Sequence, residues 1–520
     1  MLKVGQVEQV EITGYTSEGL GVCRVDGCAV FVPNAIRGEV CRIRLTHVSR
    51  NSAHGKIEQI LERSAHRISR ACAEARLCGG CQLHHMDYEE ELNFKAQKVY
   101  DALTRLGGQR LSPAYQATGN GRQATGAEGC EAAGSGRPAA AHISAPHAAA
   151  GSGQQATEKA FPLGGRCPSL QTGADEGTSD DRPVPITGAE EINAYRNKAQ
   201  YPVAVKNGRP AAGFYKNRTH DVVPVTRCAI LPEVFDRARD TVIRWAEEDR
   251  VPVYDERTGK GLLRHIYVRR GAVSGQVMVC VVANGEQLPR ENRLVNALRR
   301  AVPGLASVIL SVNRRDTNVV LGDCFRTLWG QEWIEDVLCG FTFRLSPRSF
   351  YQVNHDQAQR LYEKAVELAD LHGTETVLDL YCGTGTITLA LSRRAGKAVG
   401  VEVVPEAIED AKENAARNGV SNVEFFCADA SIAAARLCAE GRKPHVILVD
   451  PPRKGLAPEV IDAMAAMAPQ RIVYVSCDPA TLARDVKLLT EKGYALQSAE
   501  AFDLFPRTYH VETVVRLSRQ

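Results

Sequence analysis

Two side chains near the C-terminal end of the chain are of the types needed for covalent chemistry. Cys477 stands in RIVYVSCDPATLARD, where an apolar run typical of a buried strand stops and Pro479 starts a turn. Glu512 opens the apolar run of FPRTYHVETVVRL, which the pattern predicts to be the last strand, antiparallel to its neighbours. An antiparallel strand begins at the edge where its parallel neighbours end, so we expect Cys477 and Glu512 at one edge of a sheet.

A thiol at such an edge can act as a nucleophile and a carboxylate as a general base. Uracil C5 is too weak a nucleophile to take a methyl group unaided. Thiolate addition at C6 makes an enolate whose C5 can attack a methyl sulfonium, and a base must then remove the C5 proton so that the cysteine is eliminated. We expect these roles for Cys477 and Glu512. For His510 we expect a neutral positioning role, with a share in the role of the base as the alternative. On position alone, a packed strand-end thiol is an equal alternative for Cys477.

The other strands predicted for this region also end in a polar residue or a glycine. These features are Asp379, Gly383, Gly385, Glu402, Asp429 and Asp450. Glycines allow close approach of a ligand, and an acid at the end of the second strand suits ribose hydroxyls. GTGTIT lacks the third glycine of a pyrophosphate cradle, so we expect a nucleoside without pyrophosphate, namely S-adenosylmethionine. A solvated acid at Glu402 and a plain strand terminator at Asp450 are the alternatives.

A second group of reactive side chains lies in CAEARLCGGC. Its cysteines, Cys72, Cys78 and Cys81, are separated by five and by two residues, and Cys228 in VVPVTRCAIL is a candidate fourth ligand. Three thiols at such short spacing predict a metal site, and zinc bound by four thiolates is one possibility. The C-x3-C-x2-C spacing expected for radical adenosylmethionine chemistry is absent.

The elements that position these residues divide the chain into four parts. Short alternating runs in residues 1–62 predict a small five-stranded barrel of the oligonucleotide-binding kind, with an SH3-like barrel as the alternative. Residues 63–111 and 186–345 predict a central, mostly β domain. Residues 112–185 are rich in Gly, Ala and Ser and predict a disordered insertion. Strand–helix alternation in 346–520 predicts a doubly wound α/β domain with a parallel sheet.

Composition and charge are those of an ordinary soluble protein, with 44% hydrophobic and 24% charged residues among 520. The 64 basic and 61 acidic side chains nearly cancel, so only local clustering can indicate a nucleic-acid partner. One cluster, within residues 30–70, contains eight basic side chains and only three acidic ones. The basic residues are Arg37, Arg42, Arg44, Arg50, Lys56, Arg63, Arg67 and Arg70. With no signal peptide or membrane span in the sequence, we expect a cytoplasmic monomer whose thiols serve metals or catalysis.

Taken together, the motifs resemble the RumA/TrmA family of RNA uracil-5 methyltransferases, in particular the bacterial 23S ribosomal RNA members. The resemblance rests on SFYQVN, DLYCGTGTI, VDPPRKG, VSCDPATLARD and FPRTYHVETV, and it covers nearly the whole chain outside the predicted insertion. It implies a C-terminal Rossmann-like methyltransferase domain that uses S-adenosylmethionine. It also implies that the N-terminal barrel is a TRAM domain, an RNA-binding module.

The resemblance further assigns roles to individual residues. The adenosylmethionine and uridine site would be lined by Gln352, Tyr381, Gly383, Gly385, Thr386, Glu402, Asp429 and Asp450. Cys477 would be the nucleophile and Glu512 the base, while Asp478 stands where Asn is common in this family. For the cysteine set, the resemblance selects a [4Fe–4S] cluster on Cys72, Cys78, Cys81 and Cys228. We expect a structural role for the cluster, because methyl transfer needs no electrons.

The leading function is therefore methylation of uridine C5 in 23S ribosomal RNA. The nearest alternative is the same chemistry on transfer RNA, and the barrel and cysteine set favour ribosomal RNA because the transfer-RNA branch usually lacks both. A non-catalytic RNA-binding protein is an alternative of another class. The presence of Cys477, Glu512, Gly383 and Gly385 argues against it.

Overall fold

The computed structural model describes residues 2–70, 72–111 and 183–520. The predicted insertion at 112–185 lies outside the described residues except for 183–185, so its disorder stays a prediction. Within the described ranges, no helix has both the length and the apolar character needed to cross a membrane.

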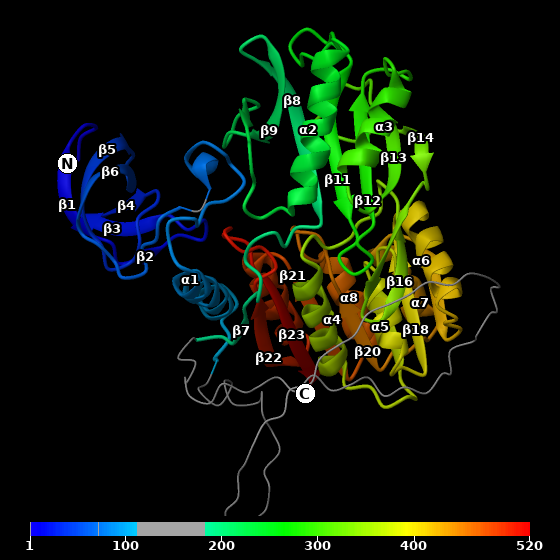
Figure 1. Cartoon of the computed structure of the whole chain (residues 1–520). Coiled ribbons are helices and arrows are strands. Elements are labelled where there is room, and N and C mark those ends of the chain that lie inside the picture. The colour runs from blue at the N-terminus through cyan, green and yellow to red at the C-terminus, as the bar shows by residue number, and fades with distance from the viewer. Residues whose placement is uncertain (1, 71, 112–182) are drawn as a thin grey trace, which may run out of the picture. The chain divides into compact units, whose positions relative to one another are not determined.

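The N-terminal part is a six-stranded sheet in the order β1-β5-β6-β4-β3-β2 (Figure 1). Its strands are β1 (Val7–Glu11), β2 (Gly14–Tyr15), β3 (Gly21–Val25), β4 (Cys28–Val32), β5 (Val40–Val48) and β6 (Ser52–Glu62). In β5, Cys41, Ile43 and Leu45 are buried, whereas Arg42 and Arg44 between them are exposed. This period of two directs one face of the strand to the core and the other to solvent. The two-residue β2 is the strand added to the five predicted.

The central part is a seven-stranded sheet in the order β10-β9-β8-β11-β12-β13-β14, in which only the pair β12–β13 is parallel. The strands are β8 (Lys198–Lys206), β9 (Arg209–Tyr215), β10 (Val222–Pro224), β11 (Leu263–Arg270), β12 (Val277–Ala283), β13 (Leu305–Val312) and β14 (Cys324–Gly330). Helices α2 (Glu233–Glu248) and α3 (Glu291–Ala301) cover one face (Figure 1). The hairpin β15 (Ile334–Leu338) and β16 (Phe341–Leu345) follows.

Strand β12 shows why the central sheet is apolar on both faces. Val279 and Val281 pack in the core under α2 and α3, whereas Met278 and Cys280 join the core shared with the C-terminal part. Alternate residues thus enter different cores. Cys280 is a buried hydrophobe without a chemical role in this arrangement.

The C-terminal part is an eight-stranded sheet in the order β19-β18-β17-β20-β21-β23-β22-β7. Its parallel strands are β17 (Thr376–Leu380), β18 (Lys397–Glu402), β19 (Val423–Cys427), β20 (Val446–Val449) and β21 (Arg471–Ser476), and β22 (Tyr494–Phe502) and β23 (Glu512–Arg519) are the antiparallel pair. Helices α4 (His355–Ala369), α5 (Thr386–Ser392) and α6 (Pro405–Arg417) contribute to the core on one face of the sheet. The core on the other face contains residues of α7 (Ala430–Ala439), α8 (Pro458–Met467) and α9 (Pro479–Glu491). These three layers confirm the predicted doubly wound α/β domain.

Helix α1 (Tyr88–Asp101) contacts the C-terminal sheet rather than the central one (Figure 1). Its N-cap is Asp87, whose side chain accepts a hydrogen bond from the Glu90 amide at 2.9 Å, and it continues into a π-helical turn η2 (Ala102–Leu106). Strand β7 (Ile186–Thr187) extends the same sheet parallel to β22. Both flanks of residues 112–182 therefore pack with the C-terminal sheet. The domain boundaries given by the sequence stay a prediction.

Candidate active site

Cys477 and Glu512 lie opposite each other at the end of two paired strands. The β21–β23 ladder ends with Ser476 facing Thr513, so Cys477 follows one partner and Glu512 precedes the other. Glu512 is 4% exposed, and Cys477 is half-buried. The structure thus places the thiol and the carboxyl at the same edge of the sheet, next to each other.

The electrostatics of this pair come mainly from burial. Burial raises the pKa of Cys477 to about 11, with further contributions from Glu512 and Asp450. Burial also raises the pKa of Glu512 to about 8 and that of Asp450 to about 7. Arg453 opposes the shifts of Cys477 and Glu512. Arg453 directly follows Asp450-Pro-Pro in VDPPRKG and is not among the site residues that the sequence predicts.

The turn between β17 and α5 is built from residues in left-handed backbone conformations. Tyr381 has a φ of 71°, Gly383 of 54° and Gly385 of 81°. Space is open where a Cβ of Gly383 would stand, whereas a Cβ on Gly385 would come within 3.1 Å of side chains packed behind the turn. The Gly383 amide donates to Glu402 Oε2 at 3.2 Å. Gly385 is therefore needed for packing, and Gly383 leaves room for a ligand above the turn.

Two acids from the neighbouring strands complete this end of the site. Glu402 ends β18, and its Oε1 accepts from the next two backbone amides at 2.9 and 3.0 Å. Asp429 follows β19 and caps α7, where hydrogen bonds from Ser431 lower its pKa. Burial raises the pKa of the Tyr381 hydroxyl to about 12, and the nearby Asp429, Asp485 and Glu402 contribute to this shift.

The buried side chain of Tyr362 in α4 connects several predicted site residues. Its hydroxyl lies near Gln352, Thr386 and Asp450, and burial strongly raises its pKa. Sequence reasoning predicted the helix but missed this residue, because its spacing in α4 is that of an ordinary core position.

Asp379 is a buried carboxyl below the glycine turn. Thr388 Oγ1 donates to its Oδ2 at 2.5 Å, while its Oδ1 has no hydrogen-bond partner in the described part of the chain. Burial raises the pKa of Asp379 to about 8. The sequence indicated only that a strand ends near this residue. An unpartnered buried acceptor beside the turn suits a ligand that supplies a donor.

Two further residues next to Cys477 have defined positions. Asp478 caps α9, since its Oδ1 accepts from the amides of Ala480 at 2.9 Å and Thr481 at 3.2 Å. Burial and neighbouring cations, chiefly Arg453, lower the pKa of His510 to about 4. His510 is therefore neutral at physiological pH, as expected for a positioning group.

The four predicted cysteine ligands line one cavity of about 300 Å³ beside the central sheet. They are Cys72, Cys78, Cys81 and Cys228. Burial raises the pKa of each thiol, and the other three raise that of Cys81 further. The structure thus brings Cys228 to the same cavity as the other three thiols, from which it is more than 140 residues apart in the chain. In the described ranges, however, no three His, Cys, Asp or Glu side chains converge closely enough to hold a metal ion.

Comparison with known sequences identifies two parts of the chain. Residues 326–520 match the profile of the tRNA (uracil-5-)-methyltransferase family, and residues 2–57 match the TRAM domain. An uncharacterized RNA methyltransferase of Clostridium tetani is 38% identical over 99% of this chain and 97% of its own length. Another from Caldanaerobacter subterraneus is 38% identical over 100% of this chain and 99% of its own length.

Among solved structures, Pyrococcus abyssi tRNA (uracil-54, C5)-methyltransferase in complex with S-adenosyl-L-homocysteine has the same fold. The TM-score is 0.69 at 24% identity, over 98% of this chain and 99% of the other. The fold, the two sequence profiles and the full-length relatives agree with one another. This chain therefore belongs to the RNA (uracil-5-)-methyltransferase family, with a TRAM domain at its N-terminal end.

Proposed function

We propose that this protein methylates C5 of uridine in 23S ribosomal RNA, with S-adenosylmethionine as methyl donor. The observation that carries the chemistry is the placement of Cys477 and Glu512 on adjoining strand ends. A nucleophile and a base that lie this close can act on C6 and C5, which are adjacent atoms of one pyrimidine ring.

The residues at the other strand ends fit S-adenosylmethionine. Gly383 leaves open space above the turn, Glu402 and Asp429 present carboxyl oxygens for hydroxyl and amine donors, and Asp379 has an unpartnered oxygen. Gln352 and Thr386, near Tyr362, would line the side toward Asp450. When bound, S-adenosylmethionine supplies an electrophilic methyl group on its sulfonium sulfur.

The residues of the chain supply the remaining chemistry. The Cys477 thiolate forms a bond from Sγ to uracil C6, which moves electron density to C5 and makes that carbon nucleophilic. Once C5 carries the methyl group, Glu512 accepts the C5 proton. The electrons of that C–H bond restore the C5–C6 double bond, the bond from C6 to Sγ breaks, and 5-methyluridine leaves.

We expect activity to rise with pH between about 6.5 and 8. Glu512 and Cys477 act in their deprotonated forms, and the pKa of each is raised, to about 8 and about 11. Because both groups must lose a proton, kcat/KM should increase by up to about a hundredfold for each pH unit below pH 8. The measurement is initial methyl transfer at saturating methyl donor across this range. A flat profile would mean that neither group titrates in the free enzyme as the structure indicates.

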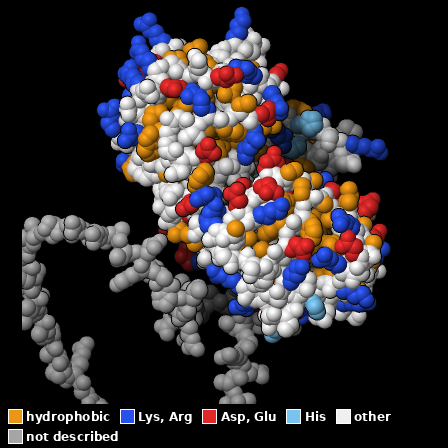
Figure 2. Space-filling model, turned by 90° about the vertical axis from the view of Figure 1, so that its right-hand side faces the viewer, with side chains coloured by type: hydrophobic (Ala, Val, Ile, Leu, Met, Phe, Trp, Pro, Cys, Tyr) orange, Lys and Arg blue, Asp and Glu red, His pale blue; other side chains and the backbone are white. Residues whose placement is uncertain are grey.

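We propose that the TRAM domain contacts the RNA substrate. The basic cluster of residues 30–70 lies in this domain and in the segment directly after it. Among the described residues, three of its eight basic side chains pair with carboxylates, in Arg37–Glu90, Arg44–Glu58 and Arg67–Glu39. The other five have no such partner there and are available to phosphates: Arg42, Arg50, Lys56, Arg63 and Arg70. By contrast, Figure 2 shows basic and acidic side chains intermixed over another face of the protein.

Ribosomal RNA is the first candidate because the sequence motifs resemble those of the 23S ribosomal RNA members of the family. Transfer RNA is the second candidate, because the protein of the same fold from Pyrococcus abyssi acts on tRNA. The deciding experiment maps 5-methyluridine by mass spectrometry in 23S ribosomal RNA and tRNA from a strain lacking the gene. We expect loss from 23S ribosomal RNA, restored by the wild-type protein and not by Cys477→Ala. Loss from tRNA alone would assign tRNA instead, and no loss would refute the proposal.

We also propose that Cys72, Cys78, Cys81 and Cys228 hold a [4Fe–4S] cluster. The proposal rests on the donor set: four thiols line one cavity, and this number suits either a [4Fe–4S] cluster or zinc. Because no three metal-binding side chains converge closely in the described ranges, the thiols must draw together when either group binds. The cluster would tie the segment around Cys72–Cys81 to Cys228 in the central domain.

Protein purified without oxygen should be brown and contain about four iron atoms and four sulfides per chain. Cys81→Ser should lose most of the iron, whereas Cys324→Ser, an exposed cysteine of β14, should keep it. Metal analysis and absorption spectra give the readout. Colourless protein with one zinc per chain would replace the cluster with a zinc site.

A further inference from the structure

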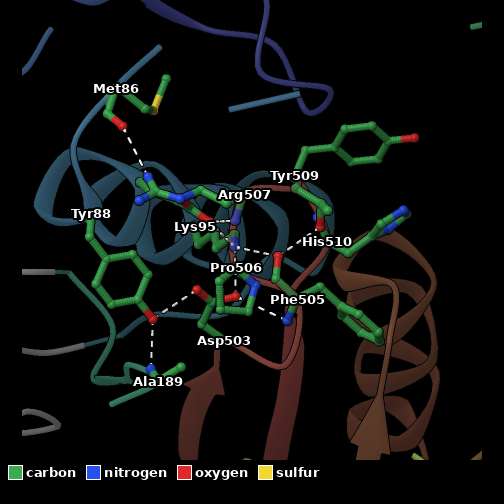
Figure 3. Close-up of polar contacts among 12 residues, drawn as sticks. Met86, Tyr88, Lys95, Ala189, Asp503, Phe505, Pro506, Arg507, Tyr509 and His510 are labelled. Carbon is green, nitrogen blue, oxygen red and sulfur yellow. Dashed lines mark hydrogen bonds and ion pairs between the residues drawn. The ribbon is translucent and has the colours of Figure 1, made fainter. Parts of the chain in front are cut away.

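A buried charged network joins α1 to the loop of residues 503–511, which leads from β22 into Glu512 (Figure 3). Its centre is the fully buried Lys95 of α1. Lys95 Nζ donates to Glu91 Oε1 at 2.7 Å, to Asp503 Oδ1 at 2.6 Å and to the Phe505 carbonyl oxygen at 3.2 Å. The three protons of the ammonium group thus have three acceptors, two of them in the loop.

The same loop is held at further points along its backbone. The Arg507 amide donates to Glu91 Oε1 at 2.7 Å, and the Arg507 carbonyl accepts from the amides of Gln82 and Leu83 at 2.9 and 3.0 Å. Arg507 has a φ of 72°, so the chain turns sharply where these contacts meet. Lys98 Nζ donates to the Tyr509 carbonyl at 2.9 Å. Thus α1 and the segment after Cys81 fix the loop near its start, middle and end.

The network lies one residue from the strand pair that carries Glu512. Asp503 follows Phe502, and Phe502 is the cross-strand partner of Glu512 in the β22–β23 ladder. Among the described residues, the Glu512 carboxyl itself has no hydrogen-bond partner. Its place is therefore set by the backbone beneath it, which the contacts of Asp503 and the loop hold in position.

We propose that Lys95 is a positioning residue for Glu512, because its bonds to Glu91, Asp503 and Phe505 fix the loop that directs the carboxyl toward C5 of the pyrimidine. This inference rests on the function proposed above. The competing explanation is that the network stabilises the packing of α1 and has no specific effect on the base. Buried ion pairs often have only such a structural role.

The two explanations differ in which chemical step they affect. Formation of the thiol adduct and methylation of C5 need Cys477 and the methyl donor, whereas the elimination that follows also needs Glu512. RNA made with 5-fluorouridine has no C5 proton to remove, so its reaction stops at the methylated covalent adduct. Comparing adduct formation on this RNA with turnover on ordinary RNA therefore separates effects on proton removal by Glu512 from effects on the earlier steps.

The experiment uses the full-length protein with transcripts of 23S ribosomal RNA and of tRNA, made with uridine or with 5-fluorouridine. Lys95→Met removes the central cation, and a triple variant, Glu91→Gln/Lys95→Met/Asp503→Asn, removes the network without leaving an unpaired buried charge. Arg239→Met is the control. It breaks a buried pair of similar geometry, Arg239–Asp236 at 2.6 Å, within α2 of the central domain.

Both network variants should form the adduct on fluorinated RNA at nearly the wild-type rate. On ordinary RNA their turnover should fall about 100-fold, the scale of a misplacement of about 1 Å, and methylated adduct should accumulate. Arg239→Met should change both rates by the same factor. A parallel loss of both rates in the network variants, or wild-type turnover in the triple variant, would overturn the positioning role. If wild-type protein forms no adduct, the proposed function itself fails.

Discussion

Cys477→Ala should abolish methyl transfer while the protein keeps its fold. Alanine cannot form the bond to C6, so C5 stays too weak a nucleophile, and kcat/KM should fall by about 10⁴-fold or more. The half-buried Cys477 side chain takes no part in the backbone ladder between β21 and β23, so its removal leaves that ladder intact. The measurement is transfer of labelled methyl groups to RNA, together with thermal unfolding.

The matched control is Cys427→Ala, which removes an exposed thiol at the end of β19, another strand of the same sheet. This variant should keep wild-type activity. Substantial methylation by Cys477→Ala would refute covalent catalysis by this residue. It would leave the family assignment, which rests on the whole sequence, unchanged.

Glu512→Gln should stop the reaction one step later and retain the RNA on the enzyme. The amide is close in size to the carboxyl but cannot accept the C5 proton, so adduct formation proceeds and elimination does not. Turnover should fall by about 10²–10⁴-fold, the usual range for loss of a general base. A covalent protein–RNA complex that survives denaturing electrophoresis is the expected observation.

Glu500→Gln provides the control for the loss of a carboxylate in this sheet, since Glu500 lies on β22 and pairs with Lys364 at 3.2 Å. It should turn over normally and leave no stable complex. If Glu512→Gln showed neither a trapped complex nor slower turnover, the base would have to be another group. Combining Glu512→Gln with Cys477→Ala should remove the complex, because Sγ forms the covalent bond.

Much of the C-terminal domain was predictable because its strands and helices are encoded locally. Apolar runs that end in Asp, Gly or Cys predict both the strands and the positions of their carboxyl ends. In a parallel sheet these ends share one edge. The placement of Cys477 beside Glu512 followed from the direction of the last strand. The alternation in β5 likewise revealed a strand with one buried face.

Other parts of the site could not be predicted, because they depend on contacts between distant segments. Tyr362 has the spacing of a core residue, and only packing of α4 against the sheet brings its hydroxyl to Gln352 and Thr386. Arg37 and Arg67 belong to a basic cluster in the sequence, yet folding pairs them with Glu90 and Glu39.

The sequence by itself determined the types of the elements, the edge at which the reactive side chains meet and the family to which the chain belongs. Only the tertiary structure decided how the base is held, since Lys95 and Asp503 are 408 residues apart and no local pattern connects them. The physical reason is that the spacing of apolar residues along the sequence indicates which face of an element is buried. The partners of a buried charge lie on distant segments, which only the folded chain brings together.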